Sequence, residues 1–372
     1  MLLARYPPVR SGAGLQAQAL ATELSTLGWR VAVITADLPH EPSRDVESDK
    51  DIFRIPVARH RLWAYLWGVK AACRVWRLRS RCCVLHVHGA NIWALPSMLV
   101  ARLLGKGVIL KMSGSDQDDP ASLGRERLGR LKLRVFSLAQ IVVSIADDLT
   151  EAYSRSGQDL GRLTPLPNGV DIYRFRPLNS TDKIVARRRL GLPVRRKVVV
   201  FTGVVRRAKG AGLVCSSWPS VLAAVGDAHL VLVGSCAEEP DFVATLKRDL
   251  QDEGVRERVT FTEHVADVAP FLNAADLYVF ASEREGMPNA LLEAMSSGLP
   301  CVAVDLPVAR ELLESGVSGR LVVNRSPEAL ASALVQLLQD EGMAAAMGQR
   351  ARRTVEDNYS LRAIACSYAD IY

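Results

Sequence analysis

Long apolar runs are missing from this sequence of 372 residues, and so is a recognisable leader. A membrane-spanning helix needs roughly 18–20 consecutive apolar residues. The longest runs here, near residues 98–104 and 198–205, are broken by Arg or Gly. The first residues, MLLARYPPVRSGAG, contain neither a positively charged segment before an apolar core nor a small-residue cleavage site. The sequence therefore predicts neither a membrane span nor secretion.

Cysteine is also scarce, and its arrangement is unlike that of a zinc site or a disulfide framework. The seven cysteines are odd in number and include no C-x-x-C pair. Such usage is typical of a reducing compartment. We therefore expect a protein of the cytoplasm.

Acidic residues are outnumbered, since 47 Lys and Arg face 40 Asp and Glu for a formal net charge of +7. A basic chain favours an anionic partner: nucleic acid, acidic lipid or a phosphorylated small molecule. No zinc-finger spacing, aromatic RNA-binding motif or helix-turn-helix pattern accompanies the charge. We therefore expect no nucleic acid, and the charge alone leaves the other two partners open.

Short apolar runs that alternate with amphipathic stretches predict an α/β fold. Examples are WRVAVITA and AQIVVSIA in the first half, and KVVVFTGV and DLYVFAS in the second. Apolar strands that alternate with helices form parallel sheets covered on both faces. The length exceeds one ordinary core. We therefore expect two Rossmann-like, doubly wound domains, with ligands at the carboxyl ends of the strands.

The domain boundaries follow from a polar, basic segment, PLNSTDKIVARRRLGLPVRRK, at residues 177–197. We predict an N-terminal, acceptor-side domain at residues 1–176, a linker at 177–196, and a C-terminal, donor-binding domain at 197–355. Residues 356–372 are expected to form a C-terminal helix that packs back toward the N-terminal domain.

The stretch EGMPNALLEAMSSGLP, residues 285–300, places two carboxylates around a predicted helix. Pro288 suits the first helical position, and Gly298 and Pro300 suit the end. Glu293 then lies on a narrow polar face, and Glu285 precedes the helix beside free backbone N–H groups. This layout fits a diphosphate between two polyhydroxylated rings, as in a sugar nucleotide. A plainer interpretation is an electrostatic cap at Glu285 and a solvated Glu293.

The wider sequence resembles a known family. The segments YPPVRSGAGLQAQALATELSTLGWRVAVIT, LPNGVDIYRFRP and AADLYVFASEREGMPNALLEAMSSGLPCVAVDLPVARELLESGVSGRLV are similar to those of family 4 retaining glycosyltransferases, the glycosyl transferases of group 1. The two Glu residues of EGMPNALLEAM match the family's signature. The resemblance covers nearly the whole chain and implies the GT-B arrangement, in which two Rossmann-like domains face each other across a cleft.

The resemblance implies a nucleoside diphosphate sugar as donor and a role for each matching residue. Glu285 would bind hydroxyls of the donor sugar, Glu293 would hold the ribose, and Lys209 would meet the diphosphate. The donor-binding residues that it implies are Gly12, Ala13, Gly14, Arg206, Arg207, Lys209, Gly286, Met287, Pro288, Asn289 and Glu293. Of these, Gly12 to Gly14 match the first glycine-rich loop, although a tight turn would explain them as well.

Three residues are assigned to catalysis by the same resemblance: Glu285, Lys209 and His88. His88, in HVHG at the end of a predicted strand, matches the family's first-domain histidine near the transferred sugar. Its alternative is a hydrogen-bonded structural histidine. We expect His86, on the same strand face, to be structural.

The chain departs from the family pattern in three places. In FTGVVRRAKG, Val204 occupies the usual arginine position, so that the phosphate contact passes to Arg206 or Arg207 or is lost. The glycine pair that often follows the second-domain motif is replaced by DLPVARELL, where Glu311 matches the helix start. The first strand is short in MLLARY, which leads us to expect a true start upstream of Met1.

The implied reaction retains configuration, because the acceptor attacks the face from which the nucleotide leaves. The departing diphosphate acts as the base, and Lys209 with an arginine neutralises its charge. No Asp-x-Asp motif lies at a suitable strand end, so we expect no cofactor and no metal. The loop SGSDQDDP, residues 113–120, is interpreted as a solvated loop or an Asp-rich metal site. We expect Asp116 on the acceptor side.

The acceptor is expected to be a lipid-linked or polysaccharide glycan intermediate. Two other functions stay open. A nucleotide-sugar 2-epimerase shares the fold, and a non-catalytic sugar-nucleotide-binding protein would also keep it.

A basic and aromatic segment, ARHRLWAYLWGVKAACRVWRLRSR, runs from Ala58 to Arg81 without an acidic residue. One interpretation is an interfacial helix, with rings at headgroup depth and guanidinium groups on anionic lipid. The protein would then sit peripherally at the inner face of the cytoplasmic membrane. The other is a sheet-covering helix that buries Leu62, Leu66 and Trp76.

Overall fold

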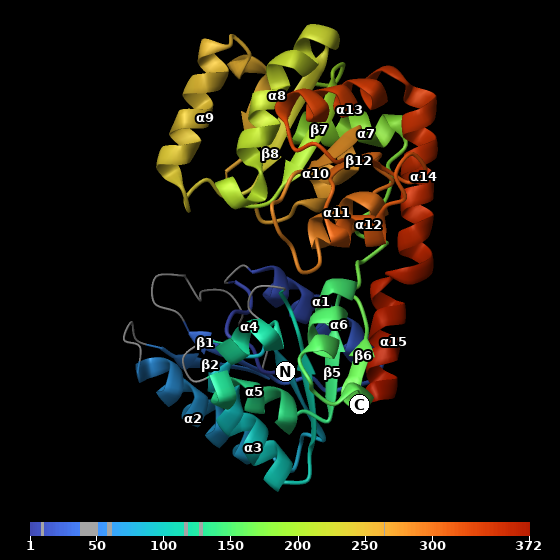
Figure 1. Cartoon of the computed structure of the whole chain (residues 1–372). Coiled ribbons are helices and arrows are strands. Elements are labelled where there is room, and N and C mark those ends of the chain that lie inside the picture. The colour runs from blue at the N-terminus through green and yellow to red at the C-terminus, as the bar shows by residue number, and fades with distance from the viewer. Residues whose placement is uncertain (9–10, 38–50, 58–61, 115–117, 126–128, 264) are drawn as a thin grey trace. The chain divides into compact units, whose positions relative to one another are not determined.

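The computed structural model describes residues 1–8, 11–37, 51–57, 62–114, 118–125, 129–263 and 265–372. The chain divides into two compact units (Figure 1). Unit 1 consists of Met1–Gly169 with Leu361–Tyr372, and unit 2 of Val170–Ser360. Within the described ranges, no helix is long and apolar enough to cross a membrane.

Unit 1 is built on parallel strands in the order β3-β4-β5-β6, with a separate pair β1-β2. The strands are β1 (Val33–Asp37), β2 (Ile52–Pro56), β3 (Val84–His88), β4 (Gly107–Lys111), β5 (Ile141–Ser144) and β6 (Leu163–Pro165). Leu2 bridges Ile34 of β1 and Val87 of β3. The N-terminal segment therefore takes the place of a strand between the pair and the larger sheet.

The helices of unit 1 cover both faces of these strands. They are α1 (Gly12–Thr26), α2 (Leu62–Arg77), α3 (Leu95–Leu103), α4 (Pro120–Arg125), α5 (Gly129–Leu138), α6 (Asp147–Arg155) and α15 (Leu361–Ile371). Helices α1 and α15 pack on the face that carries Ile109 and Val143. Helices α2 and α3 pack on each other and contact strands of the same unit.

Unit 2 contains one parallel sheet in the order β12-β11-β10-β7-β8-β9. The strands are β7 (Lys197–Thr202), β8 (Ala228–Val233), β9 (Val259–Phe261), β10 (Leu277–Phe280), β11 (Cys301–Val304) and β12 (Arg320–Val322). The helices are α7 (Ser180–Arg189), α8 (Ala211–Ala224), α9 (Pro240–Asp252), α10 (Ala269–Ala274), α11 (Asn289–Ser296), α12 (Pro307–Leu312), α13 (Pro327–Gln339) and α14 (Glu341–Asn358). Strands β7, β8 and β10 are almost wholly apolar and buried, as a sheet covered on both faces requires.

The strand order of unit 2 reverses between β7 and β10. From β7 the chain proceeds through β8 to β9 on one side, and from β10 through β11 to β12 on the other. Ligands of doubly wound sheets bind at the carboxyl ends of the strands where this reversal occurs. The loops that follow β7 and β10 are therefore the place in unit 2 where a site is expected.

The structure differs from the predicted linker at residues 177–196, because the chain passes between the units at Gly169 and the segment belongs to unit 2. It contains α7, which packs on α10. Arg187 of α7 is buried, donates to the carbonyl of Ala274 at 2.9 Å and forms an ion pair with Asp276. A buried, fully bonded arginine explains why a basic, apolar-poor sequence is part of a packed domain here.

Candidate functional site

Two loops meet at the carboxyl ends of β7 and β10 in unit 2. The backbone N–H of Glu283, after β10, donates to the carbonyl of Ala208, after β7, at 3.0 Å. Gly210 has a φ of +75°, and a Cβ built on it would lie 1.9 Å from the carbonyl oxygen of Ala281. Only glycine allows this backbone conformation and this approach together. The glycine thus sets Lys209, its neighbour, beside the loop that follows β10.

Lys209 and Glu285 form an ion pair at this junction, between Nζ and Oε1. The hydroxyl of Ser282 donates to the same carboxylate oxygen at 2.8 Å. The Lys209 side chain is 27% exposed and that of Glu285 16%. Because both groups are partly shielded from water, their charges act over short distances more strongly than on an open surface. The pair presents a cation and a hydrogen-bond acceptor side by side.

Helix α11 follows directly and carries the second carboxylate. It begins at Asn289, with Pro288 as the preceding cap residue, and Gly298 beyond its end has a φ of +71°. Burial raises the pKa of Glu293 to about 7, and the positive charge of nearby Arg174 opposes this rise. A partly buried carboxyl with a strongly raised pKa is typical of a ligand site.

Two serines at the end of α11, Ser296 and the C-cap residue Ser297, are structural. Ser296 is buried and donates to the carbonyl of Phe175 at 2.7 Å, and Ser297 is buried and donates to Asn273 at 3.1 Å. Both bonds are to unit 2 groups upstream of the helix. Glu293 therefore stands apart from the serines that share its predicted polar face.

The arginines before Lys209 are held by acids after β8. Arg206 forms an ion pair with Glu238 at 3.2 Å, and its Nε is buried without a hydrogen-bond partner among the described residues. Arg207 is exposed, its backbone N–H donates to Glu239 at 3.1 Å, and its guanidinium lies 4.4 Å from the ring centre of Phe242. Of the two arginines, Arg207 exposes more of its side chain to solvent.

In unit 1 the corresponding reversal lies between the N-terminal segment and β3. Ser11 caps α1 and accepts a hydrogen bond from the N–H of Gly14 at 3.0 Å. A Cβ on Gly14 would lie 2.7 Å from the carbonyl oxygen of Arg5. Gly12 and Ala13 are exposed in the first helical turn. The glycine-rich stretch is therefore an open helix start whose last glycine is required by close packing.

His88 ends β3 and is buried, with no hydrogen-bond partner for its Nε2 among the described residues. Its ring stacks on that of His86 at a centroid distance of 4.3 Å. His86 Nδ1 lies 2.7 Å from the hydroxyl of Tyr372. Burial lowers the pKa of both histidines, and the charge of Lys111 lowers both further. Both imidazoles are therefore neutral at pH 7.

Two family models match the chain. The glycosyl transferase 4-like domain matches residues 11–169, and the model described as glycosyl transferases group 1 matches residues 196–340. The two matches follow each other along the chain and together cover most of it.

The chain belongs to the family 4 glycosyltransferases of group 1.

Curated relatives and solved structures agree. The chain is 24% identical, over 99% of its own length and 94% of the relative's, to N-acetyl-alpha-D-glucosaminyl L-malate synthase of Bacillus anthracis. It is 25% identical, over 93% of its own length and 89% of the relative's, to the lipopolysaccharide core biosynthesis mannosyltransferase LpsB of Rhizobium meliloti. The crystal structure of Anabaena Alr3699/HepE in complex with UDP and glucose matches all of the chain and 97% of its own, at a TM-score of 0.79 and 18% identity.

The predicted fold class is confirmed: this glycosyltransferase is an α/β protein with the two Rossmann-like domains of the GT-B fold. Of the predicted donor-side residues, the structure brings together Lys209 and Glu285, with Gly286 partly exposed and Met287 and Pro288 buried beside them. Asp116 lies outside the described residues. Within the described residues, no group of three or more His, Cys, Asp or Glu gathers that could hold a metal ion.

Arg325 is a neighbour of the candidate site that the sequence analysis did not identify. It follows β12, donates to the carbonyl of Ala281 at 3.1 Å and forms an ion pair with Glu283 at 3.3 Å. A single arginine in a polar loop carries no recognisable signal. Arg325 lies close to the loop after β10 because of the order of the strands in the sheet, which local sequence does not reveal.

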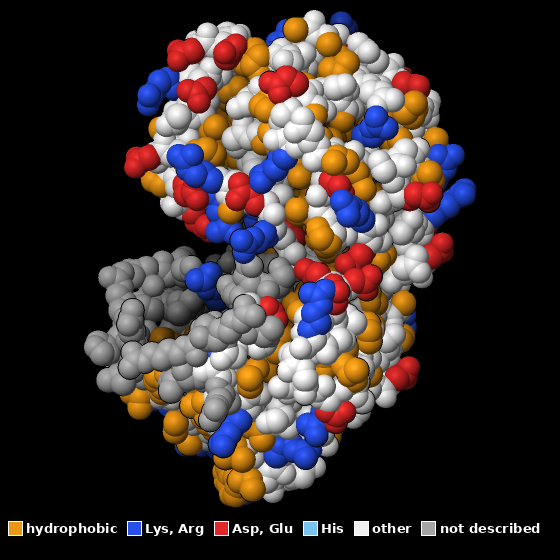
Figure 2. All heavy atoms as spheres, in the orientation of Figure 1, with side chains coloured by type: hydrophobic (Ala, Val, Ile, Leu, Met, Phe, Trp, Pro, Cys, Tyr) orange, Lys and Arg blue, Asp and Glu red, His pale blue; other side chains and the backbone are white. Residues whose placement is uncertain are grey.

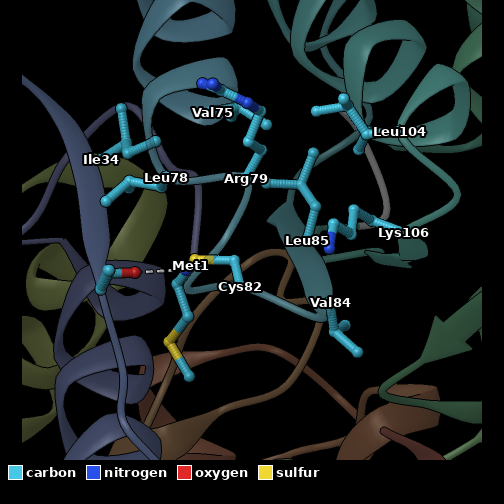
Figure 3. Close-up of a pocket in the computed structure, with 12 residues that line it drawn as sticks. Met1, Ile34, Val75, Leu78, Arg79, Cys82, Val84, Leu85, Leu104 and Lys106 are labelled. Atoms are coloured by element: carbon cyan, nitrogen blue, oxygen red, sulfur yellow. Dashed lines mark hydrogen bonds between the residues drawn. The ribbon is translucent and has the colours of Figure 1, made fainter.

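A pocket in unit 1 lies away from the predicted residues (Figure 3). It is lined mainly by apolar side chains from the ends of α2 and α3, from the turns that follow them and from neighbouring strands, and Figure 3 shows Val84 and Lys106 beside it. These two residues mark the amino ends of β3 and β4, whereas His88 marks the carboxyl end. The pocket includes none of the predicted site residues.

Proposed function

We propose that the protein transfers a sugar, with retention, from a nucleoside diphosphate sugar to a hydroxyl of a lipid-linked or polysaccharide glycan. The observation that carries the proposal is the Lys209–Glu285 pair at the strand reversal of unit 2, directly before α11 with its Glu293. The relatives support it. One is named a lipopolysaccharide core mannosyltransferase, and a similar structure contains UDP and glucose.

In the proposed step, the bond between the anomeric carbon and the diphosphate oxygen breaks while a bond to the acceptor oxygen forms on the same face. The acceptor proton passes to the departing diphosphate, so that no further base is needed. Lys209 offsets the charge that develops on that diphosphate. Arg206 or Arg207 takes the place of the phosphate arginine whose usual position Val204 occupies.

The two carboxylates have different tasks in this proposal. Glu285, held by Ser282 and Lys209, accepts hydrogen bonds from hydroxyls of the transferred sugar. Glu293 accepts from the ribose, which compensates for its burial. In unit 1, the proposal assigns His88 to the transferred sugar and the start of α1 to the diphosphate, and it requires no metal.

The test is a binding screen followed by product analysis. Thermal shifts against a panel of nucleoside diphosphate sugars identify the donor, because a bound ligand raises the melting temperature. Incubation of that donor with lipid-linked glycan acceptors should then give a new glycosidic bond of unchanged anomeric configuration by NMR. An isomerised sugar nucleotide would instead establish the epimerase, and binding without any product would establish a non-catalytic binding protein.

We further propose that the enzyme works at the cytoplasmic face of a membrane and binds anionic lipid through unit 1. Helix α2 does not bury the residues expected of a sheet-covering helix. It buries Trp67, Ala71 and Val75, while Leu66 is 48% and Trp76 51% exposed. This corrects the expectation that Leu66 and Trp76 lie against the sheet, and the side chain of Leu62 lies outside what the structure describes.

The exposed apolar residues of α2 continue onto α3. We call this surface the α2–α3 face, and it comprises Tyr65, Leu66, Val69, Trp76, Leu99 and Leu103. Hydrophobic side chains and Lys or Arg lie together in Figure 2 where Figure 1 places these two helices. Neither helix contains an acidic residue. Rings and aliphatic side chains at headgroup depth, with cations beside them, match an anionic lipid surface.

The cytoplasmic assignment rests on the cysteines. Cys73, Cys83 and Cys366 are exposed, and all seven cysteines are free. Exposed free thiols are compatible with a reducing compartment. Sedimentation with phosphatidylglycerol vesicles, but not with phosphatidylcholine vesicles, is the expected result for the lipid proposal. Equal sedimentation with both would remove it.

A further inference from the structure

Lys111 is a buried cation with no acidic partner among the residues that the structure describes. It ends β4, pairs in register with His88 of β3, and is 4% exposed. Its ammonium lies 5.5 Å from the ring centre of Tyr368 on α15, and this cation–π contact is the one that the described residues offer the ammonium. Cation–π contact offsets only part of the cost of burying a charge. Desolvation accordingly lowers the pKa of Lys111 to about 7.

The surroundings of Lys111 contain further unsatisfied groups. Among the described residues, nine buried side-chain N or O atoms have no hydrogen-bond partner, and three of them lie here: His86 Nε2, His88 Nε2 and Tyr368 Oη. Buried polar atoms are nearly always bonded. Three such atoms on adjacent rings, next to an ammonium that no described acid pairs with, indicate that a further polar group belongs among them.

Asp118, the buried acid of the described residues, already accepts several hydrogen bonds. The Asp118 carboxylate accepts from the N–H of Ala90 at 2.6 Å and from both the N–H and the hydroxyl of Ser113, at 2.5 and 2.8 Å. No ion pair joins Asp118 to Lys111 in the described part of the chain. Asp118 is therefore held by the loops after β3 and β4, and it does not compensate the charge of Lys111.

We propose that Lys111 is the counter-charge for an oxyanion group, a phosphate or a carboxylate, on the acceptor substrate. This inference rests on the proposed function and narrows its acceptor to an anionic one. The position fits, because Lys111 and His88 end neighbouring strands beside the strand reversal of unit 1. An oxyanion there would receive donors from the ammonium and from one imidazole N–H, which satisfies groups that the protein alone leaves unpaired.

The experiment uses sulfate and malonate as probes of a tetrahedral oxyanion and of a dicarboxylate. Thermal shifts are measured in wild type, in Lys111→Met, in Lys111→Arg and in the control Lys106→Met, against sodium chloride at equal ionic strength. Lys106 is a lysine just before the same strand, at its opposite end, and is only half-buried. Sulfate also stabilises proteins by general exclusion, but that effect is common to all four proteins.

We expect at least one probe to bind wild type, Lys111→Arg and Lys106→Met with similar affinity, and to bind Lys111→Met at least tenfold more weakly. Without a probe, Lys111→Met should melt at the same or a higher temperature, because an uncompensated buried charge is removed. A structural lysine predicts the reverse, so a Lys111→Met protein that melts lower or fails to fold overturns the proposal. Equal binding of the probes to Lys111→Met, or no binding of either to wild type, also overturns it. A donor shift measured in parallel reports on the proposed function separately, since failure of donor binding leaves the probe result intact.

Discussion

The ammonium of Lys209 contacts the Oε1 carboxylate oxygen of Glu285, although the two residues are 76 positions apart in the chain. One follows β7 and the other β10, and these strands are neighbours only because the sheet order reverses between them. In a free enzyme each group is the other's partner. A donor that carries both hydroxyls and a diphosphate has the chemistry to take over both, the hydroxyls at Glu285 and the phosphates at Lys209.

Lys209→Ala and Glu285→Gln are each expected to lower turnover at least tenfold, which corresponds to about 1.4 kcal/mol of barrier or more. Lys209 would no longer offset the charge of the leaving diphosphate, and Glu285 would lose its charged acceptor. Neither side chain supports a hydrophobic core, so circular dichroism and melting temperature should stay close to wild type. Turnover of the identified donor by each variant is the measurement.

The control for this pair is Lys247→Ala, which removes a lysine from a surface ion pair with Glu263 at 3.9 Å. It should leave turnover unchanged. If Lys209→Ala turns over at the wild-type rate, or if either site variant unfolds, the assigned roles are wrong.

Gly210→Ala is expected to destabilise unit 2 more than Gly254→Ala. Both glycines have a φ near +70°, so each alanine adds a similar backbone strain of about 1 kcal/mol. A Cβ at Gly254 would meet nothing within 4 Å, whereas one at Gly210 would lie 1.9 Å from the Ala281 carbonyl oxygen. Displacing that backbone should add on the order of 1–3 kcal/mol. Urea unfolding of both variants measures the difference, and equal stabilities would show that the loop moves without cost.

The Glu293 carboxyl gives a pH prediction. Its pKa rises from 4.5 to about 7 on folding, so the folded state holds a proton that the unfolded state releases. The contribution of this bound proton to the free energy of unfolding is complete below about pH 4.5, and it is lost as the pH rises through 7. Glu293→Gln, which stays neutral, should therefore exceed wild type in unfolding free energy at pH 8 and converge with it at low pH. The exposed Glu257→Gln serves as control, and parallel profiles for all three proteins would refute the shift.

The stretch from Glu285 to Gly298 could largely be predicted from the sequence. Helix α11, its end at Gly298 and the separation of Glu285 from Glu293 follow from proline, glycine and helical spacing. The contact between Glu285 and Lys209 was not predicted, because it depends on strand order, which is a long-range property. The glycine-rich loop predicted at Gly12 to Gly14 is the start of α1, but the sequence analysis did not predict that Ser11 caps this helix.

Other features could not be read from local pattern. In α2, Leu66 and Val69 stand at helical spacing, yet both are exposed and the helix buries Trp67, Ala71 and Val75. Periodicity gives a face but does not say which face meets the sheet when both are apolar. Local pattern also gave no sign that Lys111 is buried at the end of β4, where it lies 5.5 Å from the ring centre of Tyr368 in the distant helix α15.

Activity is expected to survive a strong chelator. The proposed charge compensation comes from Lys209, an arginine and the start of α11, all supplied by the chain. The test compares turnover before and after treatment with EDTA and gel filtration. Loss of activity that magnesium or manganese restores would show that a metal takes part.

The α2–α3 face gives the last prediction, on lipid binding. The double variant Trp76→Ala/Leu103→Ala removes two side chains that are 51% and 78% exposed, so the fold should tolerate it while membrane contact is lost. Tyr173→Ala is the matched control, since Tyr173 is 79% exposed but lies in unit 2. With phosphatidylglycerol vesicles we expect severalfold weaker sedimentation for the double variant and none of this weakening for Tyr173→Ala. High salt should weaken wild-type binding as well, because charges exposed to water are screened within roughly 8 Å at physiological ionic strength. Sedimentation of the double variant at the wild-type level would show that this face does not contact lipid, and salt-independent binding would show that the surrounding cations do not contribute.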